Sequence, residues 1–161
     1  PLGQPLARPD HRGVFILATA DIDAARAAAQ SDPTVEAGVF VMDLQPFRTE
    51  AELDRIPAMH QAAVAASGVA NPELGFHARP YVLLTGAPAA AAEEAMRSCA
   101  GGPAVLFQGR LGQGADEQAL FCLDLREPAG AAAALPAAVH WTVIPWFASE
   151  EVAVLGQEAA R

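Results

Sequence analysis

The sequence contains one pattern twice, and this repeat limits the folds open to the chain. Residues 2–4 and 111–113 both read Leu-Gly-Gln, and each leads into a short apolar run, at residues 13–17 and 119–123. In both copies an alanine-rich stretch and a second apolar run follow. Only the second copy has a front segment, residues 80–109. The repeat therefore predicts two related units, and we expect a further β-α-β segment before Pro1 to complete the first.

The spacing of apolar residues predicts strands and helices in each copy. Short runs of β-branched and aromatic residues between turn signals are typical of buried strands. In the first copy these are residues 14–17 and 39–47, joined by a helix that Asp21 caps and that ends at Gln30. In the second copy the pattern predicts strands at 81–85, 103–109, 118–125 and 138–147, with helices at 88–100 and near 128–136.

The order of the second copy is βαββαβ, which is the ferredoxin-like arrangement, with two helices on one face of a four-stranded antiparallel sheet. The other face of such a sheet is apolar and has to be covered. Two tandem units can cover each other, which predicts an α+β fold in which ferredoxin-like units in tandem form a single-chain dimeric α+β barrel. The expected divisions are 1–48 (half of a first unit), 49–79 (a connecting helix over 50–68, kinked at Pro57, and a linker), 80–148 (a complete second unit) and 149–161 (a C-terminal helix).

Composition excludes several classes of function. The net charge is −9, and all ten basic residues are arginines, so the chain would repel a nucleic-acid backbone. No apolar stretch approaches the length of a membrane-spanning helix, and no leader opens the sequence. The two cysteines, Cys99 and Cys122, have no zinc-ligand spacing. We expect a cytoplasmic protein without metal or cofactor that binds a small molecule, with a pseudo-dimer inside one chain and further self-association left open.

Asp32 is the best candidate for a catalytic residue. It continues the helical stripe of Ile22, Ala25 and Ala29, so the spacing predicts a carboxylate on the core side, where desolvation would raise its pKa and suit it to proton transfer. The alternative is an ordinary helix cap, because aspartate is favoured just before a proline in the first turn, here Pro33.

The register of the two copies predicts a ligand cavity. Pro46 aligns with Pro145, which places the bulky side chains of both final strands under the helices. By elimination, Asp43, His140 and Thr142 face the interior between the sheets, where they would line a ligand site.

The segment S-D-P-T-V-E-A-G-V-F at residues 31–40, together with Gln45-Pro46-Phe47, resembles the C-terminal signature of the YciI-like (YCII-related) family. In that family a "DP-x-V-x-AG" turn leads into a last strand ending in "PF", and Pro1-Leu2-Gly3 is similar to the family's "GPL". The resemblance implies a dimeric α+β barrel. It also implies an active site that pairs a helix histidine with the aspartate of the turn, here Asp32. Some relatives remove chloride from chlorinated hydroquinones.

The sequence departs from the family at two places. The family histidine would lie in the front segment that the first copy lacks. The second copy has lost the "DP" turn, and in Met96-Arg97-Ser98-Cys99 it has Cys99 where the family helix, "MR-x-H", has histidine. The resemblance therefore implies one site per chain at most, with the second unit as a degenerate scaffold.

The expected function is that of a YciI-like small-molecule enzyme that uses Asp/His proton transfer on a small oxygenated substrate, aromatic ones included, with lyase, isomerase or dehydrochlorinase-like activity. Asp32 would be the base or would orient it, with His140 or His60 in support. One alternative is a non-catalytic ligand-binding or scaffold protein, which the lost signature of the second copy favours. Another is a cofactor-free oxygenase or isomerase, on fold analogy alone. A buried His–Asp pair in one cavity would favour an enzyme.

Overall fold

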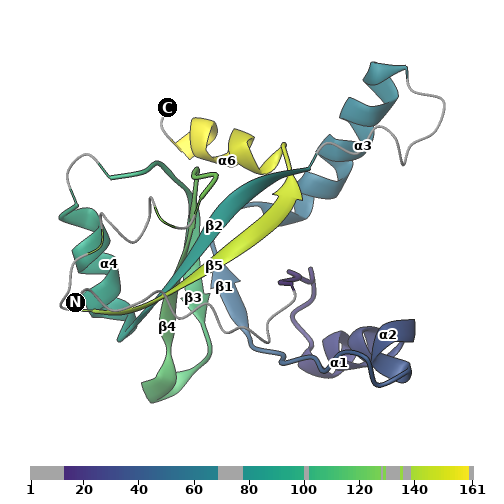
Figure 1. The fold of residues 1–161 in the computed structure, drawn as a ribbon, viewed down its shortest axis with the longest axis horizontal. Coiled ribbons are helices and arrows are strands. Elements are labelled where there is room, and N and C mark those ends of the chain that lie inside the picture. The colour runs from purple at the N-terminus through teal and green to yellow at the C-terminus, as the bar shows by residue number, and fades with distance from the viewer. Residues whose placement is uncertain are drawn as a thin grey trace.

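The computed structural model describes residues 13–68, 78–99, 102–127, 129, 135 and 139–159, and it shows an α+β fold with one open five-stranded antiparallel sheet (Figure 1). The strands are β1 (Phe47–Thr49), β2 (Ala78–Ala87), β3 (Val105–Leu111), β4 (Gln118–Leu123) and β5 (His140–Ser149). Their order across the sheet is β1-β3-β4-β2-β5. The described helices are α1 (Ile22–Gln30), α2 (Pro33–Glu36), α3 (Ile56–Ser67), α4 (Ala89–Arg97) and α6 (Val152–Ala159), with short 3-10 turns η1 (Leu53–Arg55) and η3 (Gly114–Asp116).

The strands of the second sequence copy form the body of the sheet. β2 lies between β4 and β5, so that Val82 is opposite Leu123 on one side and Pro145 on the other. Helix α4 follows β2 and leads to β3, and β4 lies between those two strands. Pro145 is tolerated because β5 is an edge strand. The four strands predicted for this copy are confirmed, whereas the helix predicted near 128–136 falls largely outside the described residues.

Helix α4 covers one face of the sheet. Its alanines allow close packing: a β-carbon on Gly86 of β2 would lie 2.6 Å from the Cβ of Ala92. Removing the apolar side chains of this face from water stabilises the fold by about 1.5–3 kcal/mol for each large residue. The buried members of this cluster are Val82, Leu84, Ala89, Ala92, Ala119, Phe121, Leu123, Val139 and Val143.

The opposite face carries a second buried cluster, which three segments cover. They are α6, the start of α3 with η1, and the extended residues 14–16. On the sheet side, the rings of Phe107 and Trp146 meet edge to face with centroids 6.2 Å apart. This is the face that was expected to meet a second sheet, and in the described part of the chain helical and extended segments occupy it. The buried members are Tyr81, Leu83, Leu106, Phe107, Leu120, Cys122, Val152 and Leu155.

The first sequence copy forms its predicted helix but not its predicted strands. Helix α1 spans Ile22–Gln30, with Ala25 and Ala29 buried as expected. The prediction of strands is wrong for residues 14–17 and for residues 39–46, which are extended without ladder pairing; pairing begins only at β1. The physical reason is that a strand needs a hydrogen-bonding neighbour, and no described strand lies beside either segment. Tandem sheets are therefore absent from the described residues.

The connecting helix begins later than predicted. Residues 53–55 form η1, and α3 starts at Ile56, so Pro57 falls in the first helical turn. A proline there loses no helical hydrogen bond, so the predicted kink is wrong. Gly68 ends the helix with φ of 70°, as its lack of a side chain allows, and this predicted end is confirmed.

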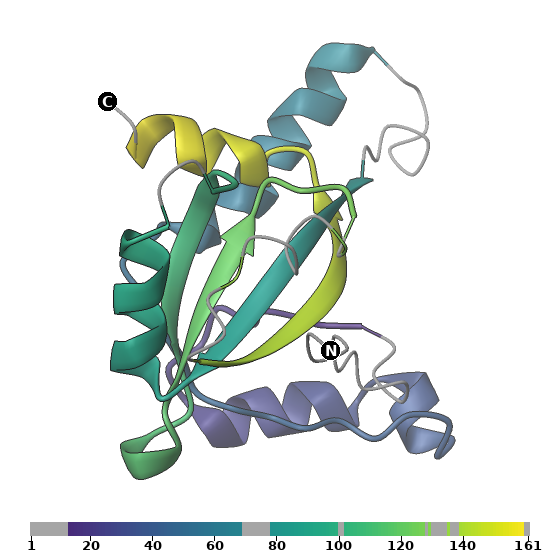
Figure 2. The ribbon, with the colours of Figure 1, turned by 60° about the vertical axis from the view of Figure 1, so that its left-hand side comes forward.

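The helices outside the sheet lie at two separate ends of the molecule. In Figures 1 and 2, α1 and α2 extend beyond one end of the sheet, and α3 and α6 lie at the other. None of the helices in the described ranges is long and apolar enough to cross a membrane.

Candidate functional site

Three polar side chains meet where α3 approaches the start of α6. Nδ1 of His60 lies 3.3 Å from Oε2 of Glu151. The hydroxyl of Ser149 donates to the same carboxylate oxygen, and the backbone N–H of Glu151 donates back to Oγ of Ser149 at 3.3 Å. The His60 and Glu151 side chains are only 20% and 15% exposed. We call these residues the His60 cluster. An imidazole with a carboxylate partner at the edge of solvent is suited to general acid–base chemistry.

The sheet holds the His60 cluster in place. The buried hydroxyl of Tyr81 on β2 donates to the carbonyl oxygens of Ser149 and Glu150, at 2.9 and 3.3 Å. These bonds fix the turn that connects β5 to α6. The two helices are anchored by apolar residues of the second face, Val152 from α6 and Ile56 from α3. The cluster is therefore attached to rigid elements on every side, as a preorganised site requires.

Glu151 is ionised over a wide pH range. Burial alone would raise the pKa of this carboxyl, but hydrogen bonds from Ser149, from its own backbone N–H and from His60 outweigh burial, and the pKa lies below the ordinary value of 4.5. Near neutral pH, Glu151 is thus an acceptor for the imidazole. A carboxylate in this position accepts from Nδ1 and therefore selects the tautomer with a proton on that nitrogen.

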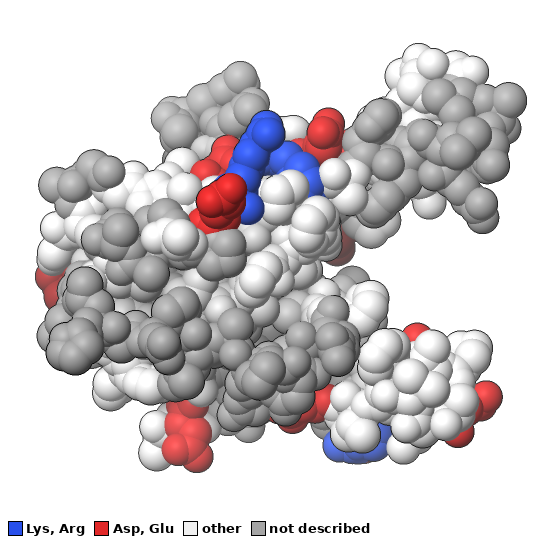
Figure 3. Space-filling view, viewed as in Figure 1, with Lys and Arg blue, Asp and Glu red and all other residues white. Residues whose placement is uncertain are grey.

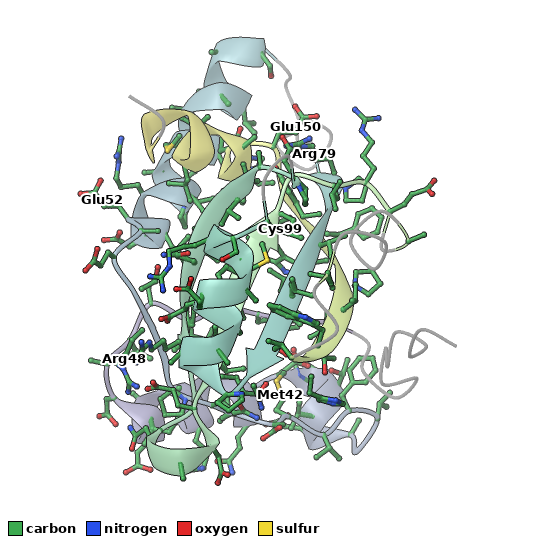
Figure 4. The ribbon with its side chains drawn as sticks, turned by 90° about the vertical axis from the view of Figure 1, so that its left-hand side faces the viewer. Met42, Arg48, Glu52, Arg79, Cys99 and Glu150 are labelled. Atoms are coloured by element: carbon green, nitrogen blue, oxygen red, sulfur yellow. The ribbon has the colours of Figure 1, made fainter. Side chains whose placement is uncertain are left out.

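A second charged pair lies at the same end of the sheet. The Arg79 guanidinium is 4.5 Å from the centre of the Tyr81 ring and 2.8 Å from Oδ1 of Asp124. Burial raises the pKa of the Tyr81 hydroxyl, and Arg79 opposes the shift only in part. Figure 4 shows Arg79 and Glu150 near each other at the end of the sheet that α6 covers. Tyr81 is accordingly a neutral hydrogen-bond donor here.

Asp32 caps a helix. It precedes α2, and its Oδ1 accepts hydrogen bonds from the backbone N–H of Thr34, at 2.7 Å, and from the Thr34 hydroxyl. These two bonds, the side-chain one first, hold the pKa of the carboxyl below its ordinary value of 3.8. The prediction of a desolvated, raised-pKa carboxylate is therefore wrong, because the side chain turns back to the α2 backbone. The alternative of a helix cap is confirmed.

The predicted cavity residues lie on different elements. Val139, just before β5, and Trp141 and Val143 on β5 belong to the apolar cluster under α4, so His140 and Thr142 lie on the opposite face, as their register predicted. Thr142 is half-buried and opposite Thr85, whereas His140 is exposed at the first residue of the strand.

Asp43 is exposed in the extended segment before β1, and Gln45 donates to it at 3.2 Å. Within the described ranges, the hydrogen-bond partner of Asp43 is Gln45 rather than His140 or Thr142, and the facing sheet that would have brought the three together is absent from those ranges.

The structure separates Asp32 from His60. Asp32 lies on the α1–α2 end of the molecule, and His60 lies with α3 and α6 at the other end (Figures 1 and 2). Figure 4 likewise shows Met42, next to Asp43, at the end of the sheet away from Glu150. The expected pairing of Asp32 with His60 therefore does not form. Glu151 is the carboxylate that contacts His60. No local pattern predicts this contact, because Ser149 and Glu151 match only the start of a helix.

A shallow groove shares helix α6 with the His60 cluster, through Leu155, although none of the three cluster residues lines it. It has a volume of about 530 Å³ and runs between the loop before η1, β3 and α6. Its floor is apolar, and two exposed acidic residues, Glu50 and Glu52, line it from the loop. Glu52 pairs with Arg55 at 2.7 Å. The other lining residues are Ala51, Val105, Leu106, Phe107, Gln108 and Leu155.

Within the part of the chain that the structure describes, no three histidine, cysteine, aspartate or glutamate side chains come together as metal ligands. His11 and His77 lie outside the described residues. No family model matches the chain, and comparisons with curated proteins and with solved structures found no match. Function has to be argued from the residues themselves.

Proposed function

We propose that the chain is a YciI-like protein built from two related units. Residues 80–148 form the complete second unit, which is ferredoxin-like, and residues 1–48 correspond to the C-terminal half of the first unit. Two observations support this reading. The strand order β3-β4-β2-β5, with α4 leading from β2 to β3, is the order of a split β-α-β unit. The Asp32–Pro33 turn follows α1 and begins α2, with Asp32 as the N-cap, at the place where the family signature that the sequence resembles has its "DP" turn.

As function, we propose a small-molecule enzyme that works by proton transfer, with His60 as the acid–base group. The observation that carries this proposal is the 3.3 Å contact between His60 Nδ1 and Glu151 Oε2 in a half-buried setting. Glu151 takes the orienting role that the sequence assigned to Asp32. It accepts from Nδ1, which fixes the tautomer, and its negative charge stabilises the imidazolium form of His60. Ser149 and Tyr81 hold Glu151 and its turn in place.

The substrate class follows from the groove and from the resemblance. An apolar floor with a few polar groups at its rim suits a small flat molecule with oxygen substituents. Two rim carboxylates disfavour a strongly anionic substrate. We therefore favour a neutral phenol or hydroquinone, whose electron-rich ring carbon can gain one proton from the acid–base group and then lose another to it, or a carbonyl compound, whose α-carbon proton a base can remove and return.

Deuterium exchange tests the proposal without knowledge of the full reaction. The intact chain is incubated in D₂O with hydroquinone, chlorohydroquinone and acetophenone, and carbon-bound deuterium is followed by proton NMR. We expect protein-dependent exchange in at least one compound, reduced roughly a hundredfold or more by His60→Gln. The matched control is His140→Gln, an exposed histidine on β5, which should retain the exchange. Equal rates for the parent chain and His60→Gln, or no protein-dependent exchange in any compound, would contradict the proposal.

The second candidate function is ligand binding without chemistry. Two observations favour it. Asp32 caps α2, and Asp32, His60 and His140 lie on three different elements of the fold. This function predicts that the same compounds shift the NMR signals of groove residues such as Leu106 and Leu155, with no deuterium exchange at carbon.

A further inference from the structure

Large apolar side chains are exposed almost entirely on one part of the molecule. Apart from Phe147, every exposed large hydrophobic residue in the described ranges lies between residues 15 and 41, in the segment that contains α1 and α2. Val41 is 96% exposed and Phe15 is 76% exposed. Figure 3 shows this lobe as mostly uncharged surface, with charged atoms toward its margins. A monomeric protein rarely leaves a large apolar area open without a binding role. The other exposed members are Leu17, Ile22, Val39 and Phe40.

Within the described ranges, the backbone of the same region makes few hydrogen bonds. Residues 14–16 and 41–45 are extended, yet neither segment makes a backbone-to-backbone hydrogen bond with another described residue. The first is tied to the sheet by a side chain, through the bond from Trp146 to the carbonyl of Val14 at 3.1 Å. The second reaches a ladder only at its end, where Gly112 donates to Pro46 at 2.9 Å. Extended segments with open edges are templates for an added strand.

The internal repeat indicates what kind of strand is missing. Residues 14–17 correspond to β4 and residues 39–47 to β5. In the second copy, β2 lies between those two strands and pairs with both. From Tyr81 to Gly86, β2 is buried on both faces and carries no charge. The element that the first copy lacks, among the described residues, is the counterpart of β2.

The distribution of charged residues also favours an uncharged apolar strand at this place. The chain has a net charge of −9, but residues 13–20 and 37–42 contain no charged side chain. An uncharged apolar strand can therefore enter beside these residues without burying an unpaired charge, and Asp43, the one charged residue of segment 41–45, already accepts a hydrogen bond from Gln45. A second copy of this chain is a poor source, because its own β2 is already paired on both sides and cannot be released without dismantling its sheet.

We infer that the extended segments 14–16 and 41–45 form a docking site for an apolar β-strand from a separate polypeptide. The strand adds main-chain hydrogen bonds to the two open segments, and its side chains cover Phe15 and Val41. This is recognition by strand addition, in which backbone pairing supplies affinity and alternate side chains supply specificity. The inference rests on the repeat and the exposed residues, and it does not depend on the chemistry of His60.

A peptide with the sequence of residues 78–88 serves as the probe, because β2 is the model for the missing strand. Hydrogen exchange of the intact chain is measured by mass spectrometry with and without this peptide, and affinity is measured by fluorescence anisotropy. We expect exchange of segments 14–16 and 41–45 to slow by about tenfold or more, as for amides that gain stable partners. A control peptide with Leu83→Pro, which loses a central N–H, should not protect them.

Two variants of the chain decide whether the site is the predicted one. Val41→Asp puts a charge on a 96% exposed position, so the fold survives while the affinity for the peptide falls by about tenfold or more. Phe147→Asp is the matched control, since Phe147 is also exposed but lies on β5, and it should bind as the parent does. The inference is overturned if the peptide does not bind, if protection appears on β5 instead, or if both segments are protected in the chain alone. Light scattering that shows a dimer lost in Val41→Asp would also overturn it.

Discussion

Nε1 of Trp146 donates a hydrogen bond to the carbonyl oxygen of Val14 at 3.1 Å, which joins strand β5 to a segment 132 residues earlier in the chain. The bond fixes the extended residues 14–16 on the second face of the sheet, where Val14 and Ile16 pack against the buried cluster. It gives this segment a defined position even though no strand pairs with it.

Trp146→Phe tests the contribution of this bond. The variant keeps an aromatic ring against Phe107 but removes the donor, so the free energy of unfolding should fall by about 1 kcal/mol. Proteolytic cleavage within residues 14–18 should become faster, because their anchor is lost. Trp141→Phe, on the α4 face of the same strand, is the control and should leave cleavage of those residues unchanged. An unaltered cleavage rate in Trp146→Phe would show that apolar packing alone holds the segment.

Gly109 permits β1 to pair with β3. A β-carbon at this position would lie 2.3 Å from the carbonyl oxygen of Arg48, a backbone atom that cannot turn aside. Gly109→Ala should therefore displace β1 and destabilise the fold by about 1–3 kcal/mol, measured by denaturant unfolding. Gly13→Ala is the control: its β-carbon would come no closer than 3.8 Å to another atom, so its effect should stay within about 0.5 kcal/mol. Equal stability of the two variants would contradict the close approach.

The Glu151 contacts should make stability depend on pH. The pKa of this carboxyl is lowered in the folded chain, because hydrogen bonds from Ser149, the backbone and His60 outweigh the effect of burial. The contribution of Glu151 to the free energy of unfolding is therefore fully present at pH values above the ordinary pKa of 4.5. It is lost as the pH falls through the lower pKa of the folded chain. Glu151→Gln should reduce the free energy of unfolding by about 1 kcal/mol at neutral pH, since the group is not deeply buried.

The difference in the free energy of unfolding between Glu151→Gln and the parent should shrink as the pH falls below the pKa of Glu151 in the folded chain. Glu150→Gln, the exposed neighbour, controls for the general effect of removing one negative charge. A constant difference between Glu151→Gln and the parent down to strongly acidic pH would contradict the assigned network.

The two cysteines should differ sharply in reactivity. Burial, with a smaller contribution from Asp124, raises the pKa of the Cys122 thiol to about 12, and its side chain is fully buried in the sheet. Only a thiolate attacks a disulfide reagent readily, so the Cys122 thiol should not react in the native chain. Cys99 is half-buried beyond the end of α4 and should react first. With Ellman's reagent we expect one equivalent under native conditions and a second after denaturation. Cys99→Ser should abolish the first, and fast labelling of that variant would contradict the burial of Cys122.

Local signals in the sequence were sufficient for the sheet body and for α1. Asp21 accepts hydrogen bonds from the backbone N–H groups of Asp23 and Ala24, as a predicted cap should, and Ala25 and Ala29 are buried on the predicted face. In β5, alternation alone placed Val143 under α4. The apolar run at 14–17 satisfied the same rules and still did not become a strand, because strand formation depends on a neighbour that local pattern cannot supply.

The His60 cluster was beyond prediction for a related reason. Its members come from α3, β5 and α6, and no spacing rule connects His60 to a carboxylate 91 residues later. Tertiary packing decides that contact. For Asp32, the helical stripe pointed to the core, but its hydrogen bonds to Thr34 were the stronger local interaction.

Helix α6 determines which end of the chain can be shortened or extended. Gly156 lets the helix lie directly on β3, since a β-carbon there would be 2.5 Å from Cδ2 of Leu106, and Val152 and Leu155 are buried with it. Removing this short helix would expose an apolar strip along β3 to water. The shortened chain would then tend to aggregate. The outer turns of α3, by contrast, hold no buried residue. A reporter or a surface tether therefore belongs near Ser67, and the last helix has to be kept intact in any truncation series.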